Sequence, residues 1–585
     1  MQGKALAALT TTLFGAMTFI STASVVPTTA LAAGPLLCTD LDTDPSAGLA
    51  GNPLIKSHTS KPVSSGGVSY CQVQLLWGRT GQENINIVVG LPLNSLDGGS
   101  GGVQGAWNGR TQGLGGGGCS GNLNPLPAVS TGYVGSGTDL GHTGGNCEPG
   151  VNPDGTYNFT FIDDFIRVAI KQQVLRSKSL ATVYYGMKPA YNYWNGCSTG
   201  GRQGYLLAQE LGDELEGILA NAPAMYWTRF QTAQMWGQIV MKDMTKGPID
   251  SKKLTFATNA AVAACGVDGI IDDPRTCTFS ANTPALICTA NGGTSGDQHC
   301  LTPVEAKAID KLWDGPRNAK GNKIWFALDR GTNLGTGFTL DGTPPFPLGV
   351  TQFHWDKHDT TFDWHSVSMD GYAEVAHDGS TNPVIPGVSL ADETDTFGNL
   401  DTFKKHGGKL LTFVGGNDQL IFPRGVINYY RQMAALYGSN PNQPDFKALY
   451  PFYRLFRAPA VGHCGAGTVV IYNPDGSVCH NPNGTVCVGP APQPQNLFPS
   501  LVNWVENGVA PDQIPTAGGR PLCPYPSTAS SSGQCGGNLE TVKTVCADVL
   551  TKYKHEDSSE QLDFTGTGVN RQTCGLAGQS ANAKP

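Results

Sequence analysis

Two serines in this chain lie in the pattern Gly-x-Ser-x-Gly, which in hydrolases can place a nucleophilic hydroxyl on a sharp turn between a strand and a helix. Ser198 follows the aromatic stretch 190–195, which predicts a short strand, and precedes residues 203–211, which predict a helix. Ser100 lies in a glycine run with neither element beside it, so we expect a loop there. The sequence therefore favours Ser198 as a nucleophile over a plain strand-to-helix turn.

A serine hydroxyl is a weak nucleophile that needs a base, and the base needs a third group to orient it. In one hydrolase arrangement the chain order is serine, acid, histidine. His463 lies in a glycine-bracketed loop, whereas His480 and His555 have polar or charged neighbours typical of solvated histidines. Asp418 follows the buried-type strand predicted at 409–414, where parallel sheets place site residues. A turn or helix-capping role is the alternative for this aspartate.

The elements that would position these residues alternate along the chain. An apolar run at 85–91 predicts a strand, and residues 161–175 and 499–506 predict helices. Such alternation predicts an α/β fold with a mostly parallel sheet, in two parts that span residues 34–224 and 400–517.

The segment between these two parts, residues 225–399, differs in character. It holds six of the ten tryptophans, many glycines and prolines, and little regular periodicity. We expect it to be an insertion between two strands of the core. Residues 518–585 are rich in serine and glycine and contain four cysteines, which predicts a disulfide-closed C-terminal extension.

The composition excludes several classes of protein. Only 14% of the 585 residues are charged, against about 25% in an average domain, and the formal net charge is -8. A hydrophobic content of 39% is too high for a disordered chain. No strongly basic stretch is present, so we expect no nucleic-acid partner held through its phosphates. The 77 glycines show no triplet period, which excludes a collagen-like chain.

The cysteines and the N-terminus point to export. There are 16 cysteines, an even number, with no C-x-x-C motif, and three close pairs predict disulfides: Cys265 with Cys277, Cys288 with Cys300, and Cys479 with Cys487. Residues 1–33 combine Lys4, an apolar stretch and a small-residue end, which predicts a cleaved signal peptide rather than a membrane anchor. We expect a secreted protein, extracellular or periplasmic, with no membrane partner.

The candidate residues together resemble a known family. Cys197-Ser198, Asp418 and His463-Cys464 are similar to the Cys-Ser, Asp and His-Cys arrangement of the tannase/feruloyl esterase family. The resemblance covers about residues 35–525, and further similar segments are 107–110, 141–142, 196–204, 267–274, 415–418, 502–514 and 520–526. It implies an α/β-hydrolase core with a large inserted lid domain.

The resemblance also implies a mechanism. Ser198 would attack an ester carbonyl, His463 would take and return the proton, and Asp418 would hold the imidazole. In the family the two cysteines beside the serine and the histidine are bonded to each other, here Cys197 and Cys464. Two buried free thiols are the alternative.

An oxyanion needs two preorganised N–H donors. One is expected from Thr199, directly after the nucleophile. The resemblance implies the other in the glycine loop, where Gly115 is the best-aligned position, with a one-residue uncertainty along the run 115–118.

The lid would supply the acyl pocket, and its aromatic residues would suit an aromatic acid by stacking. Ordinary packing within the lid is the alternative for any single one of them, such as Trp355, Phe362 or Trp364.

Lids of this family carry a calcium loop within a disulfide. Between Cys265 and Cys277 this chain keeps Asp268 and the Ile270 carbonyl, but the earlier aspartates of the family pattern are absent. Calcium takes six to eight oxygens, and this shortened loop offers fewer. A structural calcium ion and a plain disulfide-closed turn are both open here. No cofactor is expected for the chemistry itself.

The resemblance implies a secreted esterase for small aromatic esters, or for phenolic esters on plant polymers, of the feruloyl esterase or tannase type. One alternative is a mono(2-hydroxyethyl) terephthalate hydrolase, a family branch whose lid arginine has no clear counterpart in this sequence. Others are a serine peptidase and a catalytically dead binding module. The dead module is disfavoured because Ser198, Asp418 and His463 are all present. The oligomeric state and the substrate-binding residues stay open.

Overall fold

The computed structural model describes most of the chain after the predicted signal peptide. Described are residues 35–541 apart from 80–84, 103, 146, 319–320, 322, 336–346, 377–382, 386–387, 390–397, 440–443, 466–467, 471–478, 483–486, 518 and 531, together with 550–551 and 561–562. The predicted signal peptide, residues 1–33, and the last two cysteines, Cys546 and Cys574, lie outside the described residues.

The centre of the molecule is a nine-stranded sheet with the order β1-β2-β3-β5-β4-β6-β7-β10-β11. Its strands are β1 (Ile55–Ser65), β2 (Val68–Trp77), β3 (Ile85–Pro92), β4 (Arg110–Leu114), β5 (Val134–Thr138), β6 (Tyr191–Cys197), β7 (Gly217–Asn221), β10 (Lys409–Gly415) and β11 (Tyr453–Ala458). From β5 to β11 all neighbours run parallel, and only the β1, β2 and β3 side is antiparallel. The predicted α/β fold with a mostly parallel sheet is confirmed.

Helices cover both faces of this sheet, as parallel strands with two apolar faces require. One face packs against α3 (Ala169–Tyr185) and α4 (Thr199–Glu210), and the other against α1 (Leu126–Val129) and α16 (Leu497–Asn507). Each face of the sheet has its own apolar core. Ile218 and Leu410 belong to the core on the side of α3 and α4, whereas the next residues, Leu219 and Leu411, belong to the core on the side of α1 and α16. The helix predicted within 161–175 is longer in the structure, because α2 (Phe159–Asp163) and a π-helical turn (Asp164–Val168) precede α3 directly.

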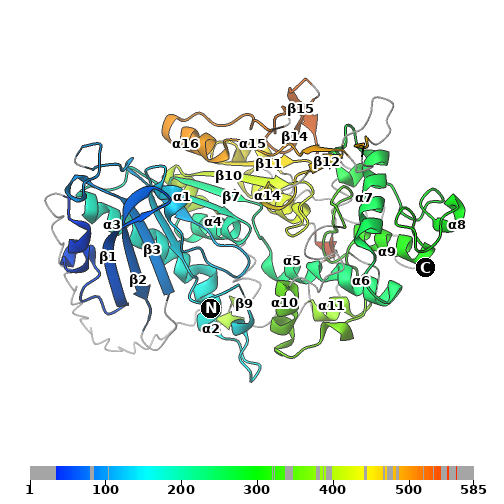
Figure 1. Cartoon of the computed structure of the whole chain (residues 1–585), viewed down its shortest axis with the longest axis horizontal. Coiled ribbons are helices and arrows are strands. Elements are labelled where there is room, and N and C mark those ends of the chain that lie inside the picture. Colours follow the sequence, from blue (N-terminus) through cyan, green and yellow to red (C-terminus); the bar gives the residue numbers. More distant parts are fainter. Residues whose placement is uncertain are drawn as a thin grey trace, which may run out of the picture.

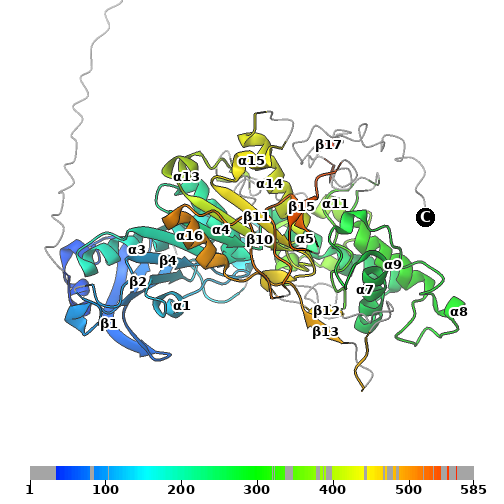
Figure 2. The same ribbon diagram turned by 90° about the horizontal axis from the view of Figure 1, so that it is seen from above.

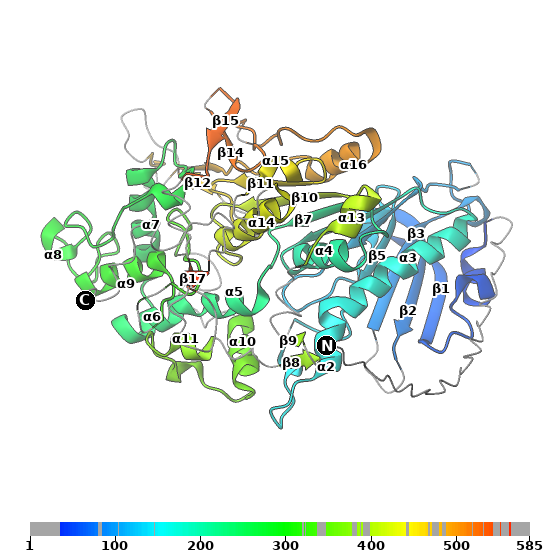
Figure 3. The same ribbon diagram turned by 180° about the vertical axis from the view of Figure 1, so that it is seen from behind.

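The chain between β7 and β10, two strands that pair directly, leaves the sheet. It forms α5 (Trp227–Gln234), α6 (Trp236–Thr245), α7 (Ser251–Cys265), α8 (Cys288–Asn291), α9 (Pro303–Asp314), α10 (Pro347–Lys357), α11 (Tyr372–Val375), β8 (Pro383–Ile385) and β9 (Val388–Ser389). Figures 1, 2 and 3 agree that these green helices lie beside the sheet, at the end opposite β1. The regularity of α5 was missed in the sequence because its side chains are mostly polar and yet almost all buried, so the helix shows no apolar stripe opposite a polar one.

After this insertion the chain returns to the core and then forms its C-terminal part. The remaining elements are α13 (Asp401–His406), α14 (Pro423–Tyr437), α15 (Phe446–Leu449), β12 (Thr468–Val470), β13 (Val488–Pro490), β14 (Ser527–Ala529), β15 (Cys535–Asn538), β16 (Leu550–Thr551) and β17 (Gln561–Leu562). The extension packs on the edge of the sheet, where the N–H of Tyr525 donates to the Leu455 carbonyl of β11 at 2.8 Å.

Disulfides join seven pairs of the described cysteines: Cys38–Cys71, Cys119–Cys147, Cys197–Cys464, Cys265–Cys277, Cys288–Cys300, Cys479–Cys487 and Cys523–Cys535. The three close pairs expected from their spacing are therefore bonded. Over the described stretches, every helix is too short or too polar to cross a bilayer.

Candidate active site

Ser198 lies on the sharp turn that joins β6 to α4, with a φ of 63° and a ψ of -124°. A positive φ is rare for a residue with a Cβ, so the surrounding structure has to hold this turn. The Ser198 N–H donates to the Asn221 carbonyl at 3.0 Å, and its carbonyl accepts the Ala224 N–H at 3.1 Å. A Cβ on Gly196 would collide with the backbone of Gly200, so glycines allow the strand and helix to approach. The serine therefore occupies the kind of strained turn that exposes a nucleophile.

Asp418 lies just past β10 and is fully buried. Its Oδ1 accepts the backbone N–H groups of Leu420 and Ile421 at 2.9 and 2.8 Å. Its Oδ2 lies 2.8 Å from Nδ1 of His463. One carboxylate oxygen is thus fixed by its own loop while the other faces the imidazole. With Nδ1 donating to Asp418, the Nε2 atom of His463 is left with a lone pair that can accept a proton.

The three candidate residues come from the carboxyl ends of three parallel strands, β6, β10 and β11, where sheets of this type place their sites. The disulfide between Cys197 and Cys464 holds the serine turn against the histidine loop, with Cα atoms 5.9 Å apart. The histidine loop in turn binds the acid loop, because the Asn417 N–H donates to the Val461 carbonyl at 2.9 Å. Residues far apart in the sequence are therefore joined into one cluster.

Thr199, the first predicted oxyanion donor, begins α4 and is buried. The first N–H groups of a helix have no acceptor within the helix, so the Thr199 N–H can turn to a negatively charged oxygen. Its side chain has a second task, since Oγ1 donates to the Gly118 carbonyl at 2.7 Å. The glycine run predicted to carry the other donor therefore lies directly against the start of α4.

Gly115, the second predicted donor, is engaged elsewhere. Its N–H donates to the Asn195 carbonyl at 3.0 Å and extends the β4–β6 ladder by one residue. The N–H of Gly116 donates to Oε1 of Gln203 at 3.1 Å, and that of Gly117 to the Ser120 carbonyl at 3.0 Å. The prediction for Gly115 is thus corrected: its amide is held by the sheet in this structure, and those of Gly116 and Gly117 also have acceptors, which leaves the Gly118 N–H as the proposed second donor.

The loop predicted to hold calcium forms a tight hairpin. The N–H groups of Val267 and Ile270 donate to each other's carbonyls at 2.9 and 3.0 Å, so the Ile270 carbonyl is already an acceptor. Asp268 and Gly269 form the two-residue turn with φ values of 52° and 76°, and the Asp268 side chain is exposed. Cys265 and Cys277 close the loop.

The other aspartates of this loop are paired with arginines. Asp272 binds Arg520 at 2.9 Å, and Asp273 binds Arg275 at 2.8 Å. Only one exposed carboxylate remains, whereas calcium takes six to eight oxygens. Within the described ranges, no group of three or more histidine, cysteine, aspartate or glutamate side chains is placed to hold a metal. The residues present do not fit a calcium ion, and the disulfide-closed turn accounts for them.

Chelation is therefore expected to leave the enzyme unchanged. Incubation with excess EDTA should shift neither the midpoint of thermal unfolding nor the rate of ester hydrolysis, because arginines already neutralise the loop carboxylates. A differential scanning calorimetry trace with and without chelator makes the comparison. Loss of stability that added calcium restores would contradict this account of the loop.

The inserted segment holds the acid loop on both sides of Asp418, a feature that sequence reasoning missed. Asn417 donates through Nδ2 to the Gly331 carbonyl at 2.7 Å. Gln234 of α5 donates through Nε2 to the Leu420 carbonyl at 2.8 Å. These long-range contacts have no signal in the local sequence, although Asn417 lies in the matching segment 415–418.

A buried ion pair adds a third connection at the same place. Arg424, at the start of α14, binds Asp329 of the inserted segment at 2.5 Å, and both side chains are buried. The candidate acid Asp418 is thus supported by contacts from outside the core fold.

Replacing Asn417 with alanine is expected to lower kcat about tenfold, because the acid loop loses an anchor next to Asp418 and small misplacements of catalytic groups are costly. The control is Asn333→Ala, which removes an asparagine bonded to Thr255 and Gly335 within the inserted segment itself. Steady-state kinetics on the two variants compares them. Equal rates for Asn417→Ala and the parent enzyme would show that this anchor does not matter.

Helix α10 docks onto the core beside the glycine run. Leu348 lies close to Gly118, since a Cβ on that glycine would contact its Cδ1 at 3.6 Å. Trp355 is almost fully buried against Gly150, and its Nε1–H donates to the Cys147 carbonyl at 3.0 Å. Trp355 is therefore packing between the inserted segment and the core rather than a free stacking surface for an acyl group.

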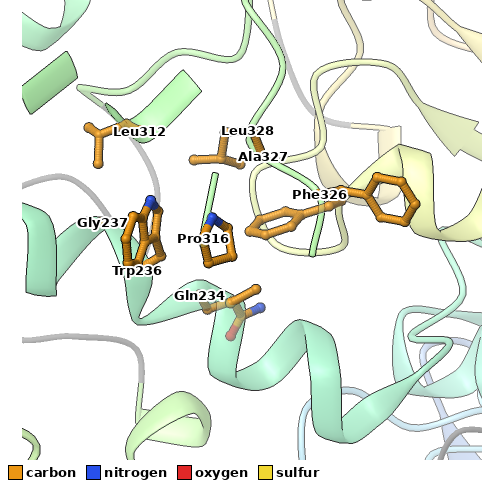
Figure 4. Close-up of a pocket in the computed structure, with 10 residues that line it drawn as sticks. Gln234, Trp236, Gly237, Leu312, Pro316, Phe326, Ala327 and Leu328 are labelled. Carbon is orange, nitrogen blue, oxygen red and sulfur yellow. The ribbon is translucent and has the colours of Figure 1, made fainter. Parts of the chain in front are cut away.

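A small pocket lies within the inserted segment, next to the start of α14 (Figure 4). It is lined mainly by apolar side chains: Ala233, Gln234, Trp236, Gly237, Leu312, Pro316, Phe326, Ala327, Leu328 and Phe422. None of the three candidate catalytic residues lines it. We read it as a packing gap behind the acid loop.

Comparison with known proteins identifies the family of the chain. A family model described as "Tannase and feruloyl esterase" matches residues 103–544. A probable feruloyl esterase of Arthroderma benhamiae is 30% identical over 510 residues, covering 80% of this chain and 83% of the relative. A probable feruloyl esterase B-1 of Aspergillus fumigatus is 27% identical over 480 residues, covering 79% and 81%.

Two solved structures share the fold. Feruloyl esterase B from Aspergillus oryzae superimposes with a TM-score of 0.65 at 23% identity, covering 85% of this chain and 99% of that chain. Tannin acyl hydrolase from Aspergillus niger superimposes with a TM-score of 0.66 at 23% identity, covering 88% and 98%. With the family model spanning most of the sequence, the chain belongs to the tannase and feruloyl esterase family.

Proposed function

We propose that this protein is a secreted serine carboxylic ester hydrolase that cleaves esters of phenolic acids, of the feruloyl esterase or tannase type. The observation that carries the proposal is the fixed arrangement of Asp418, His463 and the strained Ser198 turn, joined by the Cys197–Cys464 disulfide. The names of the relatives, feruloyl esterase and tannin acyl hydrolase, supply the substrate class.

In the first half of the proposed reaction, Oγ of Ser198 attacks the ester carbonyl carbon while Nε2 of His463 takes the hydroxyl proton. The carbonyl oxygen gains the negative charge and is stabilised by the Thr199 N–H and a second donor from the glycine run. As the carbon–oxygen bond to the alcohol breaks, His463 returns the proton to the leaving oxygen. An acyl-enzyme and a free alcohol result.

In the second half, His463 activates a water molecule that attacks the acyl-enzyme, and collapse of this intermediate releases the acid and regenerates Ser198. Asp418 holds Nδ1–H of the imidazole and stabilises the imidazolium that forms in each half. Its buried carboxylate suits this task, because its second oxygen is held by two backbone N–H groups and the group has one orientation. The reaction consumes one water and needs no cofactor.

We further propose that the inserted segment 225–399 acts as a lid that shapes the acyl pocket. Its contacts with the acid loop through Gln234 and with the glycine run through Leu348 support this proposal. Export through the predicted signal peptide fits the seven disulfides of the described residues, which form in oxidising compartments.

A substrate panel tests the proposed function. Methyl ferulate and methyl gallate should be hydrolysed at rates well above background, and casein and peptide anilides should not be cleaved. Mono(2-hydroxyethyl) terephthalate is included because it carries a free carboxylate that phenolic esters lack. Preference for that substrate, or cleavage of the peptides, would overturn the assignment to phenolic acid esters.

A further inference from the structure

The glycine run 115–118 is held against helix α4 by three hydrogen bonds. The Gly200 N–H donates to the Gly116 carbonyl at 2.9 Å, and Oγ1 of Thr199 donates to the Gly118 carbonyl at 2.7 Å. The third bond runs the other way, from the Gly116 N–H to Oε1 of Gln203 at 3.1 Å. All three partners lie in the first turns of the helix that begins after Ser198.

These bonds matter because a run of glycines has no side chains to fix its backbone. Glycine populates left- and right-handed conformations almost equally, so each peptide in the run can rotate unless both of its faces are held. Oxyanion donors work only when they already point at the reacting oxygen. A free glycine run would lose much of this preorganisation.

The side chain of Gln203 completes the set of hydrogen bonds that holds Gly116. Its side chain is fully buried on α4, five residues after Ser198. Oε1 takes the N–H on one side of the Gly116 Cα, while the Gly200 N–H binds the carbonyl on the other side. Oε1 would also lie 3.2 Å from a Cβ placed on Gly115, so the glutamine packs along the run as well. Both peptides beside Gly116 are thereby fixed to the helix that carries the nucleophile.

We propose that Gln203 is a positioning residue for catalysis: it acts through the glycine run, by locking the Gly116 peptide so that the run presents an N–H to the oxyanion. The inference rests on the proposed serine esterase mechanism. It assigns no direct contact between Gln203 and substrate. Its effect should therefore appear in the transition state and not in substrate binding.

The chain offers a matched control in Gln173. This glutamine of α3 is also fully buried, and its Nε2 donates to the carbonyls of Ser136 and Leu114 at 2.8 and 3.3 Å. It supports the strands next to the run without touching Gly116. Among the described residues, each of the two glutamines has one amide atom without a partner, Nε2 in Gln203 and Oε1 in Gln173, so both are buried amides that are half satisfied.

The experiment compares Gln203→Met with Gln173→Met on p-nitrophenyl acetate, an activated ester that does not depend on which acid the enzyme prefers. Gln203→Met should lower kcat about 10- to 100-fold with KM within about twofold, whereas Gln173→Met should keep kcat within about twofold. Binding of phenylboronic acid, whose serine adduct places an oxygen on the oxyanion donors, should weaken in parallel with kcat. Gln203→Asn, whose shorter side chain withdraws the acceptor oxygen, should behave like Gln203→Met and replaces it if the methionine variant does not fold.

Unchanged kcat and boronate affinity in a folded Gln203 variant would overturn the inference, and so would an equal loss in Gln173→Met. Ser198→Ala separates this failure from failure of the mechanism itself. If Ser198→Ala is inactive while Gln203→Met is fully active, only the role of Gln203 is wrong. If Ser198→Ala still turns over the ester, the proposed serine mechanism is wrong.

Discussion

Ser198→Ala is expected to reduce hydrolysis of methyl ferulate and methyl gallate by a factor on the order of 10⁴ or more, because no other group at the turn can form the acyl-enzyme. The backbone of the turn is held by Asn221 and Ala224 and does not depend on the hydroxyl. Thermal unfolding of the variant should therefore match that of the parent enzyme.

The second Gly-x-Ser-x-Gly serine provides the control. Ser100 lies on an exposed bend among glycines, without the strand and helix that flank Ser198. Ser100→Ala should retain full activity in the same assay of released acid by chromatography. Full activity in Ser198→Ala, or its loss in Ser100→Ala, would refute the choice of nucleophile.

Removal of the Cys197–Cys464 disulfide should have the next largest effect. In the double variant Cys197→Ala and Cys464→Ala, kcat should fall at least about 100-fold, because the serine turn and the histidine loop are no longer joined and their geometry loosens. The bridge spans 267 residues, so a loop-entropy model assigns it about 5.6 kcal/mol of stability.

The disulfide Cys288–Cys300 of the inserted segment serves as the comparison. It spans only 12 residues, and by the same model its loss should cost about 3 kcal/mol. Denaturant unfolding and kinetics are measured together on the two double variants. The proposal predicts lower stability in both but lower kcat only in the first. Similar kcat values in the two double variants would show that the Cys197–Cys464 disulfide stabilises the fold without affecting catalysis.

Most of the candidate catalytic cluster could be proposed from the sequence because each of its members sits in a short local pattern. Ser198 is marked by glycines between a strand and a helix, and Asp418 by its position after a buried strand, and both elements are present in the structure. The antiparallel strands β1 and β2 were harder to predict, since β1 is polar along most of its length and gains its place by pairing. Propensity alone does not reveal such an edge strand.

What the sequence could not supply depends on register and on contacts over long distances. The hydrogen bond of Gly115 follows from how β4 aligns with β6, which no local pattern encodes. The anchors of the acid loop join Asn417 to Gly331 and Gln234 to Leu420. The arginine partners of Asp272 and Asp273 likewise appear only when the chain is folded, and they decide against calcium.

The placement of the inserted segment between β7 and β10 has a consequence for biosynthesis. With the export proposed above, synthesis from the N-terminus would bring Cys197 into an oxidising compartment before Cys464, and the short-range pairs Cys265–Cys277 and Cys288–Cys300 could complete in between. Until Cys464 is available, Cys197 must stay a free thiol, or it must pair with another cysteine and later exchange that disulfide for the correct one. Recombinant yield should therefore depend on a disulfide isomerase in the host more than on the strength of the oxidant.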